Sequence, residues 1–215
     1  MERSKVAIVI PALNESATIA EIVKIAGKYG TPIVVDDGST DSTGGLARQA
    51  GGVVVSHSHN LGYDASLNSG FLKASEIECD LIITLDGDGQ HDPTILQKFI
   101  DRVNAGADVV VGVRSSRKRL AEHVFAWYTR IRYGINDPLC GMKAYLKNVY
   151  LDLGHFDSYG SVGTELMLFA ARKGYKLDEV PFVVRERIDH SRFGKIISGN
   201  YKIFKALLLS LWRIK

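Results

Sequence analysis

The chain is poor in cysteine and proline, and it contains no long apolar run. Its two cysteines, Cys79 and Cys140, exclude a disulfide framework and a cysteine-based zinc site, and they favour a reducing compartment. No apolar segment approaches the roughly 20 residues that a membrane-spanning helix needs. The N-terminus shows no signal-peptide pattern. We therefore expect a cytoplasmic protein that is, at most, peripheral at the inner face of a membrane.

Two phosphate-binding signatures are also missing. No G-x-G-x-x-G follows the first apolar segment, which argues against a dinucleotide-binding dehydrogenase. The motif G-x-x-x-x-G-K-[ST] is also absent, which argues against a P-loop NTPase. The composition, with 46% hydrophobic and 24% charged residues in 215, is that of a globular protein. This length suits a single domain over residues 1–215.

Positive charge is unevenly distributed along the chain. The net charge is +3, but residues 114–133 hold six Lys/Arg and one acid, and residues 185–215 hold eight Lys/Arg and two acids. Positive charge therefore gathers in the second half, where it would suit an anionic partner or form only a solvated surface. We expect no nucleic acid as that partner.

Short runs of Val and Ile alternate with helix-like segments over the first half of the chain. Their continuous apolar character is typical of strands covered on both faces. The expected strands are Val6–Ile10, Ile33–Val35, Val53–Val55, Leu81–Leu85 and Val109–Val113. The expected helices cover 18–29 (opened by a capping box at Thr18), 43–50, 64–76 and 93–105. This alternation predicts an α/β fold with a mostly parallel sheet, which binds ligands beyond the carboxyl ends of its strands.

The pattern becomes less regular after residue 114. We expect helices at 120–133, 146–153 and 164–173, and strands at 142–145 and 176–185. Trp127, Tyr128 and Tyr133 are expected in the core. The last helix, near 196–214, is amphipathic, with basic residues interleaved in an apolar stripe of Ile197, Tyr201, Phe204, Leu208 and Leu211.

The segment Thr84–Pro93 carries the strongest chemical signal. Asp86 and Asp88 follow an apolar strand one residue apart, and Gln90 adds an amide oxygen. Such oxygen ligands on a glycine-containing turn suit Mg²⁺ or Mn²⁺, which leave further positions for substrate phosphates. The alternative is an Asx-rich turn that caps the helix after Pro93.

Two other strand ends carry polar residues that could bind a nucleoside. Asp36 and Asp37 follow the second strand, where either could accept hydrogen bonds from a ribose or a base, or could simply cap the next helix. Pro11, Asn14 and Glu15 follow the first strand, where Asn14 could equally be a helix cap and Glu15 a surface charge. Together the three strand ends predict a nucleotide pocket beside a metal site.

The segments IPALNE, VVDDGSTDST, HNLGYDASLNSG and TLDGDGQHDP, in this order and spacing, resemble a family 2 glycosyltransferase with the GT-A fold. The later segments DPLCGMKAY, TEL and GYKLDEVP resemble the branch of dolichol-phosphate mannose synthase and its polyprenyl-phosphate relatives. The resemblance implies a Rossmann-like sheet with a nucleotide-sugar-binding half over 1–113, an acceptor-side half over 114–195 and an amphipathic helix over 196–215.

The resemblance also implies roles for individual residues. It places Pro11, Asn14, Glu15, Asp36 and Asp37 at the nucleoside of an activated sugar. The cation on the diphosphate would be held by Asp86, Asp88 and Gln90. The catalytic set would be Asp88, Arg114, Lys143, Glu165 and Arg192. The branch usually has arginine where this chain has Lys143, and lysine near Arg192, which loosens the assignment of sugar and acceptor.

The implied reaction is an inverting displacement at the anomeric carbon of a GDP- or UDP-sugar, assisted by Mg²⁺ or Mn²⁺. A polyprenyl or dolichyl phosphate acceptor is already ionised at pH 7 and needs cationic partners. A saccharide or glycolipid hydroxyl would instead need a base such as Glu165. Glu165 could instead be only an acid in the first turn of a helix, where the helix dipole favours negative charge. Two other functions remain as alternatives: a sugar-nucleotide nucleotidyltransferase and a non-catalytic binding module.

The terminal helix leaves two interpretations open. A basic amphipathic helix over 196–215 could lie in a membrane interface and bring the enzyme to a lipid acceptor. It could also pack its apolar stripe on the domain or on a second subunit.

Overall fold

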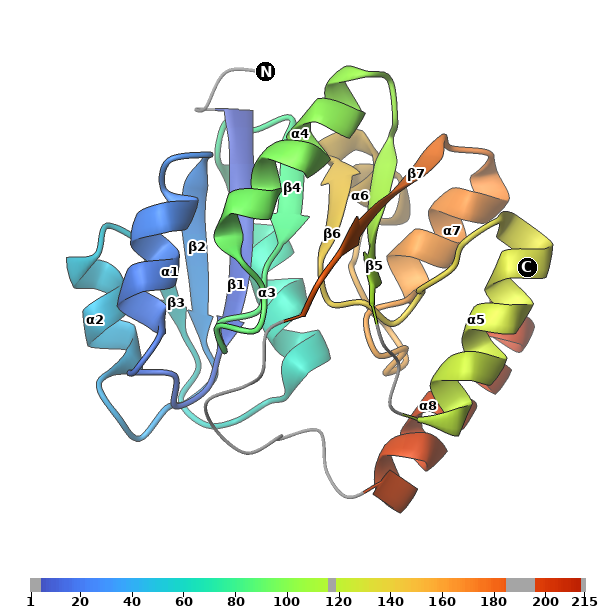
Figure 1. Cartoon of the computed structure of the whole chain (residues 1–215). Coiled ribbons are helices and arrows are strands. Elements are labelled where there is room, and N and C mark those ends of the chain that lie inside the picture. The colour runs from blue at the N-terminus through green and yellow to red at the C-terminus, as the bar shows by residue number, and fades with distance from the viewer. Residues whose placement is uncertain (1–4, 116–118, 185–195, 214–215) are drawn as a thin grey trace.

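The computed structural model describes residues 5–115, 119–184 and 196–213. It contains a seven-stranded sheet with the order β3-β2-β1-β4-β6-β5-β7 (Figure 1). The strands are β1 (Val6–Ala12), β2 (Thr31–Asp36), β3 (Val53–Ser56), β4 (Leu81–Thr84), β5 (Val109–Arg114), β6 (Lys143–Leu146) and β7 (Leu177–Phe182). All neighbours pair in parallel except β6, which is antiparallel to β4 and β5. The expected mostly parallel α/β sheet is confirmed.

Helices cover both faces of this sheet. One core lies between the strands and α1 (Ile19–Ala26), α2 (Thr43–Gln49) and α4 (Leu96–Asn104), the last preceded by a short 3₁₀ helix, η2 (Pro93–Ile95). The other core lies under α3 (Tyr63–Glu76), α5 (Leu120–Tyr133), α6 (Lys147–Leu153), α7 (Glu165–Lys173) and α8 (Ile196–Arg213). Along β1, Val9 packs in the second core and its neighbours Ile8 and Ile10 pack in the first. Two-sided burial is why the strand sequences are continuously apolar.

Parallel pairing brings the carboxyl ends of β1, β2 and β4 to one edge of the sheet. In register, Ala12 of β1 lies beside Asp36 of β2, and Val9 lies beside Thr84 of β4. The polar segments that follow these strands therefore emerge side by side at the edge seen at the bottom of Figure 1.

Three sequence expectations about helices are wrong. The first helix ends at Ala26 rather than near Tyr29, and Thr18 makes no side-chain cap bond, because its Oγ1 donates instead to the carbonyl of Gly87 at 2.8 Å. Trp127 was expected in the core, but its side chain is 66% exposed, because α5 faces the core with Ala121, Phe125 and Ala126.

The apolar stripe expected for the terminal helix is exposed where the structure describes its side chains, and another side of the helix packs on the protein. α8 buries Ile203, Ala206 and Leu207, whereas Tyr201 and Leu208 of the expected stripe are exposed. The helix is apolar on more than one side, so its sequence alone did not reveal which side packs on the protein. Within the described residues, no helix has both the length and the apolar character needed to cross a bilayer.

Candidate active site

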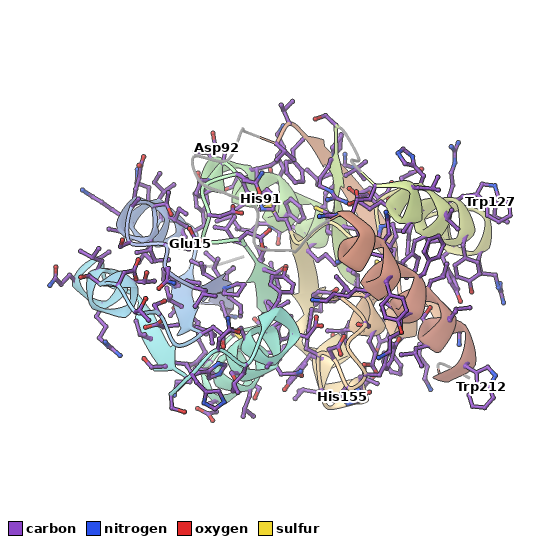
Figure 2. The ribbon with its side chains drawn as sticks, turned by 90° about the horizontal axis from the view of Figure 1, so that it is seen from below. Glu15, His91, Asp92, Trp127, His155 and Trp212 are labelled. Atoms are coloured by element: carbon purple, nitrogen blue, oxygen red, sulfur yellow. The ribbon has the colours of Figure 1, made fainter. Side chains whose placement is uncertain are left out.

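The candidate active site lies at the carboxyl edge of the parallel strands. Figure 2 views the molecule from this edge and labels Glu15 after β1 and His91 and Asp92 after β4. The hydrogen bond from Thr18 to the carbonyl of Gly87 joins the two loops directly. The site thus combines segments that are some 70 residues apart in the chain, as the strand order requires.

The loop after β1 is fastened to the loop after β2. Asn14, whose φ is 49°, receives the N–H of Thr40 on its Oδ1 at 2.8 Å, and its own N–H donates to Oγ of Ser39 at 2.9 Å. The N–H of Glu15 donates to Oγ1 of Thr43 at 2.8 Å. The Asn14 side chain is exposed and that of Glu15 half-buried, so both border the open side of the site. Asparagine tolerates this left-handed conformation better than most residues, which explains its presence here.

Asp36 and Asp37 separate into different environments. Oδ1 of Asp36 accepts the N–H of Ser39 at 3.0 Å, as an Asx turn does. Asp37 is 5% exposed, and its carboxylate accepts the N–H groups of Leu61 and Gly62, both at 2.9 Å, and lies 2.7 Å from Nδ1 of His57. Both oxygens of Asp37 are thus engaged within the protein, where they hold the loop between β3 and α3.

Asp86 and Asp88 lie in the loop after β4. Oδ1 of Asp86 accepts the hydroxyl of Tyr63 at 3.2 Å, and its Oδ2 lies 3.6 Å from Nδ1 of His91. Oδ1 of Asp88 accepts the N–H of Gln90 at 3.0 Å, so these two predicted ligands are adjacent. The expected capping role in this loop belongs to Asp92, whose Oδ1 accepts the N–H of Thr94 at 3.0 Å.

The surroundings of Asp86 fit a divalent cation. A Cβ atom placed on Gly141 would lie 2.5 Å from Oδ2 of Asp86, so glycine leaves room in front of this carboxylate. Nδ1 of His91 is buried without a hydrogen-bond partner beside the same oxygen. The described residues contain no group of three or more His, Cys, Asp or Glu side chains that could hold a metal alone. Two carboxylates and an amide suit Mg²⁺ or Mn²⁺, because these ions take their remaining oxygens from water and phosphate.

Two of the predicted acceptor-side residues, Arg114 and Lys143, are held by partners within the protein. Arg114 is bound to Asp137 through Nε to Oδ2 at 2.8 Å and Nη2 to Oδ1 at 2.9 Å. Lys143 is 3% exposed, and its Nζ donates to the carbonyls of Cys140 at 2.6 Å and Gly163 at 3.1 Å. Burial lowers the pKa of Lys143 to about 8. Arg192 lies outside the described residues.

Glu165 begins α7 and is 6% exposed. Its Oε2 accepts the N–H of Ser158 at 2.5 Å, and its Oε1 accepts the hydroxyl of Ser158 at 2.9 Å and lies 3.0 Å from Nε2 of His155. Both oxygens are therefore occupied by the loop that precedes the helix. Through these contacts the carboxylate fixes the preceding loop to the start of α7.

A strained turn next to this loop was not foreseen. Val162 has φ of 56°, which is rare for a β-branched residue, and Gly163 follows with φ of 71°. Their backbone N–H groups favour the charged form of the Asp64 carboxylate, which lies in the first turn of α3. Burial raises the pKa of Asp64 to about 6, and the nearby Asp157 adds to the shift. Only the structure reveals this pairing, because the two segments are distant in sequence.

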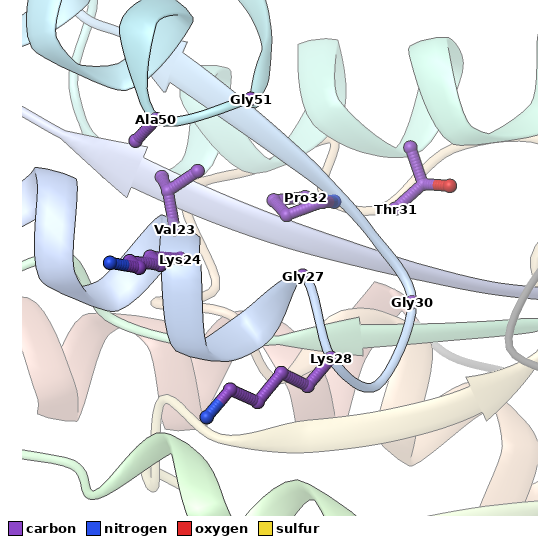
Figure 3. A pocket seen from close by; sticks show the side chains of 9 residues that line it. All are labelled: Val23, Lys24, Gly27, Lys28, Gly30, Thr31, Pro32, Ala50 and Gly51. Atoms are coloured by element: carbon purple, nitrogen blue, oxygen red, sulfur yellow. The ribbon is translucent and has the colours of Figure 1, made fainter.

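A groove lies at the edge of the sheet opposite the candidate active site. This groove of 710 Å³ is lined by the end of α1, the start of β2 and the turn at Ala50 and Gly51 (Figure 3). Its only charged side chains are Lys24 and Lys28, and no predicted site residue borders it. Ligands of parallel sheets bind at the carboxyl edge, so this groove does not belong to the candidate active site.

Comparison with known proteins identifies the family. The model of "Glycosyl transferase family 2" matches residues 7–150. An uncharacterised protein of Methanocaldococcus jannaschii is 30% identical, with 99% of this chain and 95% of that protein covered. The dolichyl-phosphate hexose transferase of Haloferax volcanii is 27% identical, with 90% of this chain and 88% of that protein covered.

A solved structure shows the same fold. Glucosyl-3-phosphoglycerate synthase from Mycobacterium tuberculosis, crystallised with Mn²⁺, UDP and phosphoglyceric acid, superimposes with a TM-score of 0.79 at 20% identity. The match covers 97% of this chain and 79% of that one. The expected GT-A fold and the expected enzyme class, a nucleotide-sugar glycosyltransferase, are confirmed. The chain therefore belongs to glycosyl transferase family 2.

Proposed function

We propose that this glycosyltransferase moves a hexose from a GDP- or UDP-sugar to a polyprenyl or dolichyl phosphate, with inversion and with Mg²⁺ or Mn²⁺. The choice of acceptor rests on the surroundings of Glu165 and Lys143. Glu165, the carboxylate expected to act as base, has both oxygens engaged, whereas the cationic Lys143 is buried beside the Asp86 loop. A relative named as a dolichyl-phosphate hexose transferase supports the same acceptor.

The donor would lie across the carboxyl edge of β1, β2 and β4. Pro11, Asn14 and Glu15 would line the nucleoside, and Asp36 and Asp37 would act there chiefly by shaping the loops that border it. Asp86, Asp88 and Gln90 would hold the cation, which supplies positive charge to the leaving diphosphate. Tyr63 keeps one oxygen of Asp86 fixed by its hydrogen bond, so the other remains directed towards Gly141.

The acceptor chemistry follows from the protonation states. A phosphate monoester has a second pKa near 6, so its oxygen is already anionic at neutral pH. That oxygen forms a bond to the anomeric carbon while the bond from this carbon to the diphosphate oxygen breaks, and the electron pair leaves with the nucleoside diphosphate. No proton has to be removed, so no free carboxylate is needed. Lys143 would offset the charge of the two phosphates, and Arg114 would act through Asp137 by ordering the loop that carries Cys140.

A product assay tests this proposal. The enzyme is incubated with GDP- or UDP-hexoses, Mg²⁺ or Mn²⁺, and water-soluble farnesyl phosphate or farnesol. We expect the release of nucleoside diphosphate and formation of a farnesyl-phosphate hexose, with no product from farnesol. Asp88→Asn should abolish transfer, whereas Asp92→Asn, a change in the same loop at a helix cap, should retain it.

The Glu165→Gln variant separates the two acceptor classes. If phosphate is the acceptor, its rate should remain within about tenfold of the wild type, since general-base catalysis contributes typically 10²–10⁴-fold. The proposed acceptor would be refuted if the wild type transferred sugar to a saccharide hydroxyl and Glu165→Gln abolished that transfer. Pyrophosphate-dependent cleavage of the nucleotide sugar into a nucleoside triphosphate and a sugar phosphate would refute the proposed reaction.

A further inference from the structure

Both tryptophans of the chain lie on the protein surface. The sequence contains two, Trp127 in α5 and Trp212 in α8, and their side chains are 66% and 84% exposed. Figure 2 shows both indoles at the flank of the molecule that these helices form. Tryptophan is normally among the most buried side chains on average, so two exposed ones on neighbouring helices require an explanation.

Other large apolar side chains are exposed on the same two helices. On α5, Ile131 is 68% exposed, and on α8, Tyr201 and Leu208 are 70% and 66% exposed. We call Trp127, Ile131, Tyr201, Leu208 and Trp212 the aromatic face. The opposite sides of both helices pack in one core, so each helix is fixed in orientation and the aromatic face cannot turn inward without unpacking it.

The exposed charged side chains described on these two helices are all basic. Arg130, Arg132, Lys202 and Lys205 are exposed. The single acid of α5, Glu122, is 5% exposed and lies 3.5 Å from Arg114 and Arg119, and the sequence of α8 contains no acid. Apolar and aromatic side chains are therefore interleaved with exposed cations and with no exposed acid on either helix. This combination is typical of helices that lie in the interface of an anionic bilayer, with Trp and Tyr at the level of the head groups.

We propose that the aromatic face, with its four flanking cations, docks the enzyme on an anionic lipid bilayer. The proposal rests on the proposed function, because a polyprenyl phosphate is a membrane lipid, and it extends the contact from the terminal helix to α5. Charge complementarity selects a bilayer over a second copy of this chain, since two such faces would bring like charges together.

The position of the face suits delivery of a lipid acceptor. α5 follows β5, and the N–H of Ala121 in its first turn donates to Oδ1 of Asn200 near the start of α8 at 3.2 Å. Both helices therefore begin at the carboxyl edge of the sheet, where Asp86 and Asp88 lie (Figure 1). A bilayer against the aromatic face would present phosphate head groups beside the site rather than behind the sheet.

The two tryptophans make the wild-type protein its own probe. Vesicles of phosphatidylglycerol and phosphatidylcholine are titrated while tryptophan emission is recorded, and vesicles with brominated acyl chains are then used as quenchers. We expect a blue shift and quenching with the anionic vesicles, both reduced by high salt, and little change with pure phosphatidylcholine. An unchanged spectrum with the anionic vesicles would overturn the proposal.

Variants separate this face from other apolar surface. Trp127→Ser with Trp212→Ser should weaken co-sedimentation with anionic vesicles at least tenfold, and Lys202→Glu with Lys205→Glu should do the same. The matched control is Leu72→Ser with Leu151→Ser, which changes two side chains, 57% and 58% exposed, on α3 and α6. An equal loss of vesicle binding in the control would contradict bilayer docking. So would a wild-type dimer, seen by sedimentation velocity, that dissociates only in the tryptophan variant.

Farnesyl phosphate separates failure of docking from failure of the proposed function. The tryptophan variant should transfer sugar to this soluble acceptor at the wild-type rate, but should lose activity on long-chain polyprenyl phosphate in vesicles. Wild-type vesicle binding without any transfer to farnesyl phosphate would leave docking supported and would refute the proposed acceptor.

Discussion

The guanidinium of Arg114 forms a two-pronged pair with Asp137, at 2.8 and 2.9 Å, and the backbone N–H of Arg114 donates to the same carboxylate at 3.1 Å. Asp137 is 1% exposed, so this pair fixes the end of β5 to the loop that leads into β6. An arginine expected at a phosphate is thus committed within the protein, in the planar geometry that lysine cannot reproduce.

Removing one partner of this pair should be costly. Asp137→Ala removes the two-pronged partner of a largely buried guanidinium and leaves only Glu122, at 3.5 Å, as an anion beside it. We expect the free energy of unfolding to fall by about 3 kcal/mol in urea denaturation. The control is Asp178→Ala, whose partner Arg102 is on the surface at 3.2 Å, where the loss should stay below about 1 kcal/mol. Similar losses in both variants would show that the Arg114 pair is no stronger than a surface pair.

Gly141 should be required for metal binding rather than for folding. In Gly141→Ala, the new methyl would lie 2.5 Å from Oδ2 of Asp86 and 3.0 Å from the Tyr63 hydroxyl, and both are ends of side chains that can move. We expect Mn²⁺ affinity, measured by electron paramagnetic resonance of the free ion, to fall about 10–100-fold as these side chains are displaced. The melting temperature without metal should change by only a few degrees.

The control for this change is Gly45→Ala in α2. A Cβ there meets nothing within 4 Å, so Mn²⁺ affinity should be unchanged. Retention of wild-type Mn²⁺ affinity by Gly141→Ala would contradict the assignment of Asp86 as a ligand.

The pKa of Lys143 predicts an activity limit at alkaline pH. Burial lowers this pKa to about 8, so the ammonium is the main form below pH 8 and loses its proton above it. If the charge assists transfer, kcat/KM should be level below about pH 8 and fall up to tenfold per pH unit above it. Lys143→Met should be slower at neutral pH and should lack this break. The same break in both proteins would assign it to another group.

Asp64 should make stability fall as pH rises from about 4 to 6. Its pKa in the folded protein is about 6, raised from 3.8, so in this range the folded state binds more protons than the unfolded state. By linkage, ionising this buried carboxyl costs up to about 3 kcal/mol, and the cost is complete above pH 6. Asp64→Asn should therefore lose part of the decline seen by denaturant unfolding at pH 4, 5, 6 and 7. A parallel decline in the variant would contradict the raised pKa.

Local sequence was sufficient for residues whose position depends on neighbours along the chain. Asp86, Asp88 and Gln90 could be placed at a strand end because strand, turn and ligand spacing are all contained in one segment. The alternative interpretation of that segment, a cap on the helix that follows, is confirmed for Asp92. Strand order then brought this segment beside Pro11–Glu15, as a parallel sheet requires.

Contacts between distant segments could not be predicted in this way. Whether Asp37 meets a nucleoside or His57 depends on how the loop before α3 returns to β2. Glu165 is engaged by Ser158 only because the preceding loop folds back on it. Trp127 was assigned to the core because aromatic residues are usually buried, whereas the direction of α5 is decided by Phe125 and its neighbours. Each of these outcomes depends on which contacts form between segments that are distant in sequence, and composition does not reveal those contacts.

The antiparallel strand β6 lies between β4 and β5, and Oγ1 of Thr84 donates to the carbonyl of Gly141 at 2.6 Å. A shortened chain that stopped at residue 113 would therefore leave the hydrogen-bonding edge of β4 open to other chains, next to Asp86 and Asp88, the proposed cation ligands. Such a fragment should aggregate rather than bind nucleotide. Gene fusions that exchange acceptor specificity would have to carry β6 with the donor half.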